Sequence, residues 1–221
     1  MSIKAVLFDI DGTLVDSNDA HVQVWLEVFR GAGTVLEPQA VHDQIGKGAD
    51  NLVPALMPGT TKADQERLGE EHGRRFKRDH LAAVRPFPGA RELLLRVREA
   101  GCRVVLASSA STAELEHYIE LMDVRDVVAE TTSSDDVENT KPAPDIFATA
   151  LGKVTPLRPD EVIAVGDTPY DVEAAARCGV ATVALRSGGF TDEVLLKAGA
   201  LALYDDADAL LSGFDTSPLA G

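Results

Sequence analysis

The stretch Ile3-Lys-Ala-Val-Leu-Phe-Asp9-Ile-Asp11-Gly-Thr-Leu-Val15 decides the fold of this chain. Residues 5–8 form an unbroken apolar run, which is typical of a strand buried on both faces of a parallel sheet. Asp9 and Asp11 follow this run, and Gly12 permits a sharp change of direction. Two carboxylates at the end of a buried strand repel each other and resist desolvation. A bound Mg²⁺ ion would relieve this repulsion, whereas the alternative interpretation is an ordinary Asp-Gly turn.

The composition indicates a globular protein and limits its partners. The chain has 221 residues, of which 45% are hydrophobic and 26% charged, and disorder is not expected at these values. A net charge of -15 argues against nucleic acid and anionic membranes as partners. No apolar run is long enough to span a bilayer, and Lys4 and Asp9 interrupt the first apolar run too early for a signal peptide. Cys102 and Cys178 are expected to be free thiols in a reducing compartment. We therefore expect a cytoplasmic protein, and no feature indicates an oligomeric state.

The hydrophobic pattern changes character along the chain. Residues 16–83 are helical in pattern, with no convincing strand. From residue 85 onward, short apolar runs alternate with helices, which favours βαβ units and a parallel sheet. The chain is expected to fray from Asp215 onward. The predicted strands are residues 5–8, 103–107, 127–131, 161–165, 180–185 and 201–204.

Polar residues stand where several of these strands end. In an open parallel sheet, ligands bind outside the carboxyl ends of the strands, so these side chains are expected to lie close together. This convergence is more informative than any single motif. The residues concerned are Asp9 and Asp11 after the first strand, Ser108 and Ser109 after the second, Lys141 in the loop after the third, and Asp167 after the fourth.

Two of these residues are suited to binding an anion. Ser108 and Ser109 precede a helix start, where a hydroxyl and free backbone N–H groups can hold a phosphate. Ser111 is better explained as the helix cap, because it begins the capping-box pattern Ser111-Thr-Ala-Glu114. Lys141 lies on a segment stiffened by prolines beside a helix N-terminus, where it can neutralise a phosphate oxygen or a carboxylate.

Asp167 and Asp171 have different interpretations. Thr168 is suited to cap a helix, and Asp171 then lies three residues after the cap, where an acid stabilises the helix start. Asp167 has no such structural explanation, so we predict it to be a direct metal ligand. Asp171 either orients the groups that bind the metal without contacting it, or supplies a further ligand.

These four segments resemble the motifs of the haloacid dehalogenase (HAD) superfamily, in the branch of phosphoglycolate phosphatase-like enzymes and β-phosphoglucomutase. Asp9-Ile-Asp11-Gly-Thr13 matches the first motif, Ser108 the second, Lys141 the third and Gly166-Asp167-Thr-Pro-Tyr-Asp171 the fourth. The resemblance covers nearly the whole chain. It implies an α/β fold with a Rossmann-like parallel sheet core, formed by residues 1–15 and 84–221, and an inserted helical cap domain, formed by residues 16–83.

The resemblance also implies a chemistry for these residues. Asp9 would be the nucleophile that forms a phosphoaspartate, and Asp11 the general acid and then the general base. Mg²⁺ would be held by Asp9, the main-chain carbonyl of Asp11, and Asp167. Ser108 and Lys141 would hold the transferring phosphoryl group. The implied function is a Mg²⁺-dependent phosphatase acting on a small phosphorylated metabolite. Phosphoryl transfer needs in-line positioning and charge compensation, which such a set supplies.

Two alternatives to a phosphatase are a phosphomutase, which the cap residues would distinguish, and a protein without catalytic activity. His21 lies near the place where β-phosphoglucomutase-like proteins carry a histidine, although an ordinary helix-face histidine explains it equally well. Ile45-Gly-Lys-Gly-Ala-Asp50 lacks the arginine pattern that we associate with the mutases. It resembles the phosphatases' substrate loop, with Lys47 a candidate substrate contact, and we therefore prefer a phosphatase to a phosphomutase. A receiver-like domain or a non-catalytic phosphometabolite-binding protein is the alternative from another class.

Overall fold

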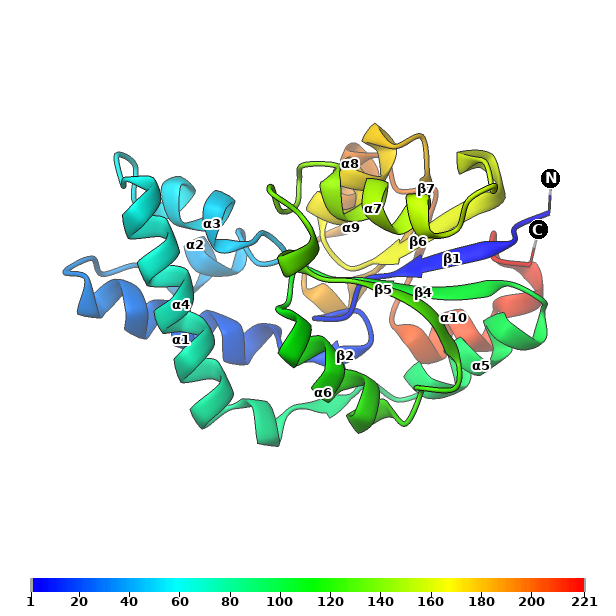
Figure 1. The fold of residues 1–221 in the computed structure, drawn as a ribbon, viewed down its shortest axis with the longest axis horizontal. Helices are drawn as coiled ribbons and strands as arrows, with labels where there is room; N and C mark the ends of the chain where they lie inside the picture. Colours follow the sequence, from blue (N-terminus) through cyan, green and yellow to red (C-terminus); the bar gives the residue numbers. More distant parts are fainter. Residues whose placement is uncertain (1, 221) are drawn as a thin grey trace.

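A six-stranded sheet forms the centre of the computed structural model, which describes residues 2–220. The strands lie in the order β5-β4-β1-β6-β7-β8, and every neighbouring pair is parallel (Figure 1). The prediction of an α/β fold with a parallel sheet is therefore confirmed. The strands are β1 (Ala5–Phe8), β4 (Arg103–Ala107), β5 (Val128–Thr132), β6 (Val162–Gly166), β7 (Ala181–Leu185) and β8 (Ala202–Tyr204).

Helices cover both faces of this sheet. Successive side chains of a strand point to opposite faces, so each strand contributes apolar side chains to both layers of helices. Val6 and Phe8 of β1 belong to a buried cluster with side chains of α5 (Ala90–Glu99), α6 (Thr112–Met122) and α10 (Ala207–Ser212). Ala5 and Leu7 pack on the other side with α7 (Asp145–Lys153) and α8 (Pro169–Arg177). The helix α9 (Asp192–Ala198), which the hydrophobic pattern did not predict, lies on the same side as α8 (Figure 1).

The register of the strands brings the functional segments to one edge. Phe8 pairs with Leu106 of β4 on one side and with Val165 of β6 on the other. The residues that follow these three positions therefore leave the sheet side by side. This is the physical reason why Asp9, Ser108 and Asp167 are neighbours although they are far apart in sequence.

The helices α1 to α4 form a separate layer beyond this edge of the sheet, which we call the cap helices (Figure 1). Trp25, Phe29, Leu68 and Phe76 are among their buried apolar residues. The first and last connections to the core pair with each other as a short antiparallel ribbon, β2 (Val15–Asp16) with β3 (Arg85–Pro86), which is too short to show a sequence periodicity. The division at residues 16–83 remains a proposal. The cap helices are α1 (Asn18–Gly31), α2 (Pro38–His42), α3 (Ala49–Leu56) and α4 (Lys62–Asp79).

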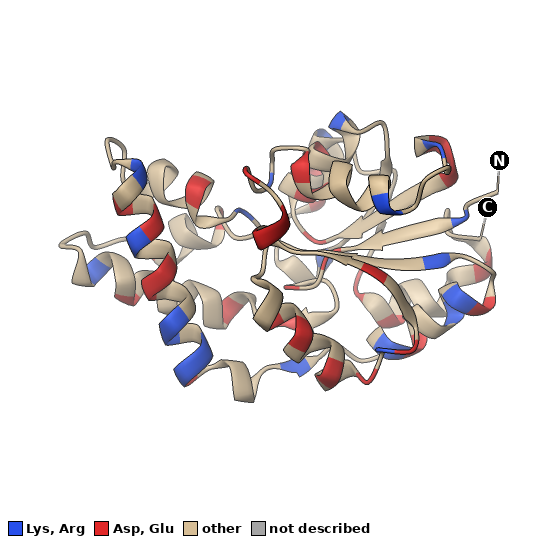
Figure 2. Cartoon of the chain, in the orientation of Figure 1, with Lys and Arg blue, Asp and Glu red and all other residues tan. Residues whose placement is uncertain are grey.

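Acidic and basic residues are interspersed along the outer helices (Figure 2). On α4, the Glu71 carboxylate pairs with Arg74 and Arg75 at 2.6 Å in each case. Exposed pairs of this kind contribute little to stability. None of the helices within residues 2–220 combines the length and the apolarity needed to cross a membrane.

The C-terminal segment packs against the core, so the expected fraying from Asp215 onward is wrong for residues 215–220; residue 221 lies outside the described residues. Leu219 is 1% exposed and belongs to the same buried cluster as β1. Asp215 pairs with Arg96 at 2.6 Å, and the guanidinium of Arg96 lies 4.4 Å from the ring centroid of Phe214. An apolar anchor near the chain end therefore fixes residues that a polar composition suggested were loose.

Leu219→Ala is expected to lower the free energy of unfolding by about 2–4 kcal/mol, because it leaves a cavity in the core. Urea denaturation followed by circular dichroism measures this loss. Leu201→Ala is the matched control, since Leu201 is 58% exposed and its truncation should change the free energy by less than about 0.5 kcal/mol. Equal stabilities of the Leu219→Ala variant and the unaltered protein would show that the C-terminal segment does not pack as described.

Candidate active site

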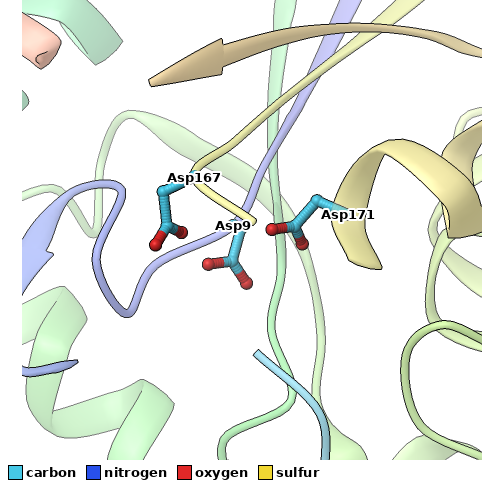
Figure 3. Close-up of side chains that lie close together, drawn as sticks. All are labelled: Asp9, Asp167 and Asp171. Carbon is cyan, nitrogen blue, oxygen red and sulfur yellow. The ribbon is translucent and has the colours of Figure 1, made fainter. Parts of the chain in front are cut away.

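Three buried aspartates meet at the carboxyl edge of the sheet. Asp9 follows β1, Asp167 follows β6, and Asp171 lies in the first turn of α8, with one oxygen of each within 4.8 Å of the others (Figure 3). Asp167 and Asp171 are fully buried, and Asp9 is 6% exposed. Burial of like charges at this separation is costly unless cations compensate them.

Lys141 supplies one of these cations. Its side chain is fully buried, and its ammonium group pairs with the Asp9 carboxylate and, at 2.7 Å, with Oδ1 of Asp171. It also donates to the carbonyl of Ala107 at 3.1 Å. The other carboxylate oxygen of Asp171 accepts from the N–H and hydroxyl of Thr168. The Asp171 N–H donates back to that hydroxyl, which completes a capping box at the start of α8. Asp171 therefore serves the helix start and the lysine at once.

The pKa values reflect the excess of negative charge. Burial raises the pKa of Asp9 to about 7, although Lys141 acts in the opposite direction. Burial, with the charges of Asp9 and Asp171, raises the pKa of Asp167 well above its usual value. Burial opposes the charge on Lys141, but the carboxylates of Asp171 and Asp9 outweigh it and raise the pKa of the lysine. Three carboxylates around one ammonium leave negative charge that a divalent cation could compensate. Carboxylate oxygens are also the ligands that Mg²⁺ prefers.

Asp167 is held in place by the loop that follows β1. Its two oxygens accept hydrogen bonds from the Thr13 hydroxyl at 2.7 Å and from the Asn18 side-chain amide at 3.0 Å. Gly12 and Gly188 press their backbones against this carboxylate so closely that a Cβ atom at either position would overlap it. Gly12 also has a φ of +78°, a conformation that other residues rarely adopt. The glycine in the Asp-Gly pair is thus required by both conformation and space.

Asp11 is bound by a different set of groups. Its Oδ1 accepts from Ser17 at 2.6 Å and from Tyr118 at 2.9 Å, and lies 3.2 Å from Nε2 of His21. Burial would raise the pKa of Asp11, but hydrogen bonds from His21, Ser17 and Tyr118 and the charge on His21 lower it overall. Three donors on one oxygen leave Oδ2 as the oxygen with free acceptor capacity.

His21 faces Asp11 and is enclosed by cap side chains. Its ring stacks on Phe76 with centroids 3.9 Å apart, and its Nδ1 lies 3.3 Å from Nε2 of His72. Burial, and then the neighbouring His21, lower the pKa of His72 well below its usual value. The sequence singled out His21 but not His72 or Tyr118, and no motif marks these two residues; only the spacing of His72 and Phe76 on one helix could have suggested a pair.

The remaining predicted residues lie around this centre. Ser108 is fully buried, and its hydroxyl accepts from the N–H of Ala110 at 3.0 Å. The Ser109 hydroxyl donates to the carbonyl of Gly46 in the cap at 3.3 Å. Ser111 forms the predicted capping box with Glu114. Lys47 is directed to the cap–core junction, where its ammonium donates to Gln44 at 2.6 Å and lies 4.3 Å from the ring centroid of Tyr170.

Comparisons with known proteins agree with this geometry. Residues 3–179 match the haloacid dehalogenase-like hydrolase family. The phosphoglycolate phosphatase of Rhodospirillum rubrum is 29% identical over 217 residues, which cover 94% of this chain and 89% of that protein. A phosphorylated carbohydrates phosphatase of Thermotoga maritima is 26% identical over 214 residues, which cover 94% of this chain and 97% of that protein.

The fold of a solved structure agrees equally well. A hydrolase from Pseudomonas syringae superimposes with a TM-score of 0.88 at 30% identity, covering 96% of this chain and 98% of the other. The predicted fold and the predicted hydrolytic enzyme are thereby confirmed. With its four motifs gathered at one edge of a parallel sheet, the chain belongs to the haloacid dehalogenase-like hydrolases.

Proposed function

We propose that this enzyme is a Mg²⁺-dependent phosphatase that hydrolyses a small phosphorylated metabolite through an aspartyl-phosphate on Asp9. The observation that supports it most strongly is the buried cluster of Asp9, Asp167 and Asp171, in which the Lys141 ammonium is held between Asp9 and Asp171. The two relatives named above are phosphatases by name. The free thiols of Cys102 and Cys178 support a cytoplasmic location.

The acidic cluster fits a divalent cation. Asp9 and Asp167 would hold it together with the main-chain carbonyl of Asp11, and Asp171 lies within reach as a further ligand. Bound there, Mg²⁺ would supply positive charge opposite the oxygens of the transferring phosphoryl group. Burial and the charges of Asp9 and Asp171 raise the pKa of Asp167, and a cation bound at this carboxylate would oppose both effects.

The chain's own residues can carry both halves of the reaction. A carboxylate oxygen of Asp9 attacks phosphorus, the bond from phosphorus to the substrate oxygen breaks, and Asp11 in its protonated form donates its proton to that oxygen and becomes a carboxylate. Asp11 then takes a proton from water, whose oxygen attacks phosphorus and releases phosphate from Asp9. Lys141 and Ser108 stabilise charge on the phosphoryl oxygens.

Asp9→Asn is expected to reduce hydrolysis of p-nitrophenyl phosphate in the presence of Mg²⁺ by about 10³-fold or more, because the amide is a poor nucleophile. Release of nitrophenol measures the rate, and circular dichroism checks the fold. Asp19→Asn, at an exposed position of α1, is the matched control and should keep full activity. Substantial turnover by the Asp9→Asn variant would rule out Asp9 as the nucleophile.

The phosphomutase alternative differs only in the acceptor of the phosphoryl group. A mutase would pass it to a second hydroxyl of a sugar phosphate, whereas a phosphatase passes it to water. Incubation with a pair of hexose phosphate isomers is expected to release inorganic phosphate. Interconversion of the isomers without phosphate release would favour the mutase, and binding of sugar phosphates without either reaction would favour a non-catalytic protein.

Mg²⁺ is expected to raise the melting temperature of the unaltered protein by about 3 °C or more at concentrations well above the dissociation constant. In Asp167→Asn this rise should be largely lost, and the metal-free variant should melt no lower than the unaltered protein, because one of three mutually repelling charges is gone. Differential scanning fluorimetry with and without EDTA measures both effects. Asp205→Asn, whose side chain is 78% exposed, is the control, and a Mg²⁺ response retained by Asp167→Asn would contradict the ligand assignment.

Tyr118→Phe is expected to lower kcat by about tenfold with little change in KM, because it removes one hydrogen bond to the Asp11 carboxylate and leaves the ring in place. Steady-state kinetics with p-nitrophenyl phosphate separates the two constants. Tyr204→Phe on the edge strand β8 is the matched control and should be indistinguishable from the unaltered enzyme. An unchanged kcat in Tyr118→Phe would show that this hydroxyl does not orient Asp11.

A further inference from the structure

One residue of the core, Thr140, is bound on all its polar groups by the start of the cap helix α3. Its N–H donates to Oδ2 of Asp50 at 3.0 Å, and its hydroxyl donates to Oδ1 of the same carboxylate. Its hydroxyl accepts from the N–H of Gly48 at 2.8 Å, and its carbonyl accepts from the side-chain amide of Asn51 at 3.1 Å. The four hydrogen bonds join residues that are about 90 positions apart in sequence.

The contact is close as well as polar. Thr140 is 9% exposed. Gly48 lies against it with no side chain of its own, and a Cβ atom at that position would overlap the Thr140 side chain. A glycine here therefore permits the backbone of the cap to approach the core within hydrogen-bonding distance. The second glycine of the Gly46-Lys47-Gly48 sequence is explained by this packing.

Thr140 immediately precedes Lys141, whose ammonium reaches the acidic cluster. The lysine side chain is fully buried and bonded to Asp9, Asp171 and Ala107, so a shift of its backbone would alter these contacts. On the core side, the Thr140 carbonyl also accepts from the N–H of Ala143 at 3.0 Å. The N–H and the hydroxyl of Thr140 are held from the cap by Asp50.

An acid at Asp50 also has a local explanation, because carboxylates stabilise the first turn of a helix. That role needs no contact with the core. Here, however, both carboxylate oxygens accept hydrogen bonds from Thr140. Asp64 in the first turn of α4 shows the purely local arrangement, since its carboxylate accepts from Thr61 and Arg67 of its own segment.

We propose that Asp50 is a positioning residue for Lys141, acting through Thr140. When α3 lies against the core, Asp50 fixes the residue before the lysine and thereby the distance from the ammonium to Asp9. The inference rests on the proposed function, because it concerns the lysine that would hold the phosphoryl group. Separate contacts fasten α2 to the core: the Tyr170 hydroxyl donates to the carbonyl of Asp43 at 2.5 Å, and Nε2 of His42 lies 2.9 Å from the carbonyl of Gly188. Loss of Asp50 therefore leaves the cap attached.

The test compares two substitutions that each remove hydrogen bonding between Asp50 and Thr140. Asp50→Ala removes the carboxylate, and Thr140→Val removes the hydroxyl while keeping the shape of the side chain. Each variant is expected to lower kcat for p-nitrophenyl phosphate by about tenfold, the effect of one hydrogen bond to a charged group. The double variant should lose less than the sum of the two single losses, because both substitutions break the hydrogen bond from the Thr140 hydroxyl to Asp50. Thr140→Ser keeps the hydroxyl and should retain most of the activity, and Asp64→Ala controls for the loss of an acid at a cap helix start.

Hydrogen exchange of the Thr140 amide provides a readout independent of activity. This N–H donates to Asp50, so its exchange should accelerate in Asp50→Ala and stay unchanged in Asp64→Ala. Unchanged exchange in Asp50→Ala, or additive losses of kcat in the double variant, would overturn the inference. Complete inactivity of the unaltered protein toward phosphate esters would instead contradict the proposed function, while the exchange measurement would still decide whether Asp50 holds Thr140.

Discussion

The buried ion pairs of Lys141 with Asp9 and Asp171 are the constraint on which the rest of the site depends. The charge of an ammonium group that is buried away from water must be compensated by carboxylates. The negative charges of these buried carboxylates are in turn compensated by the lysine. Because Asp167 adds a further negative charge beside them, the cluster stays incompletely neutralised. Stability and chemistry thus oppose each other here, since a better balanced cluster would have less affinity for a cation.

The sheet and a few local features of the structure bring the members of this cluster together. Parallel strands in register deliver Asp9 and Asp167 to the same edge, and the capping box of α8 fixes Asp171 there. The glycines at positions 12 and 188 let two loops close over Asp167. Each of these devices is local, but together they hold three like charges within reach of one another.

The sequence predicted the parts of the site that local patterns encode. Asp9, Asp167 and Ser108 each follow an apolar strand, so their edge of the sheet could be predicted from the topology. The partners of Asp11 could not be predicted, because Tyr118 lies 107 residues away and nothing in its helix marks which side faces the site. Ser17 is the N-cap residue of α1, yet its hydroxyl makes no capping hydrogen bond and donates to Asp11 instead.

Contacts between the cap and the core reach both Asp11 and the segment that carries Lys141. Asp11 is held by Tyr118 from the core and by His21 from the cap. Lys141 is held by the carboxylates of the core, and Asp50 of the cap holds the residue before it. Asp11 therefore lacks its contact with His21, and Thr140 its contact with Asp50, when the cap lies away from the sheet. These contacts form together when the cap lies against the sheet, so closure of the cap and assembly of the site are coupled.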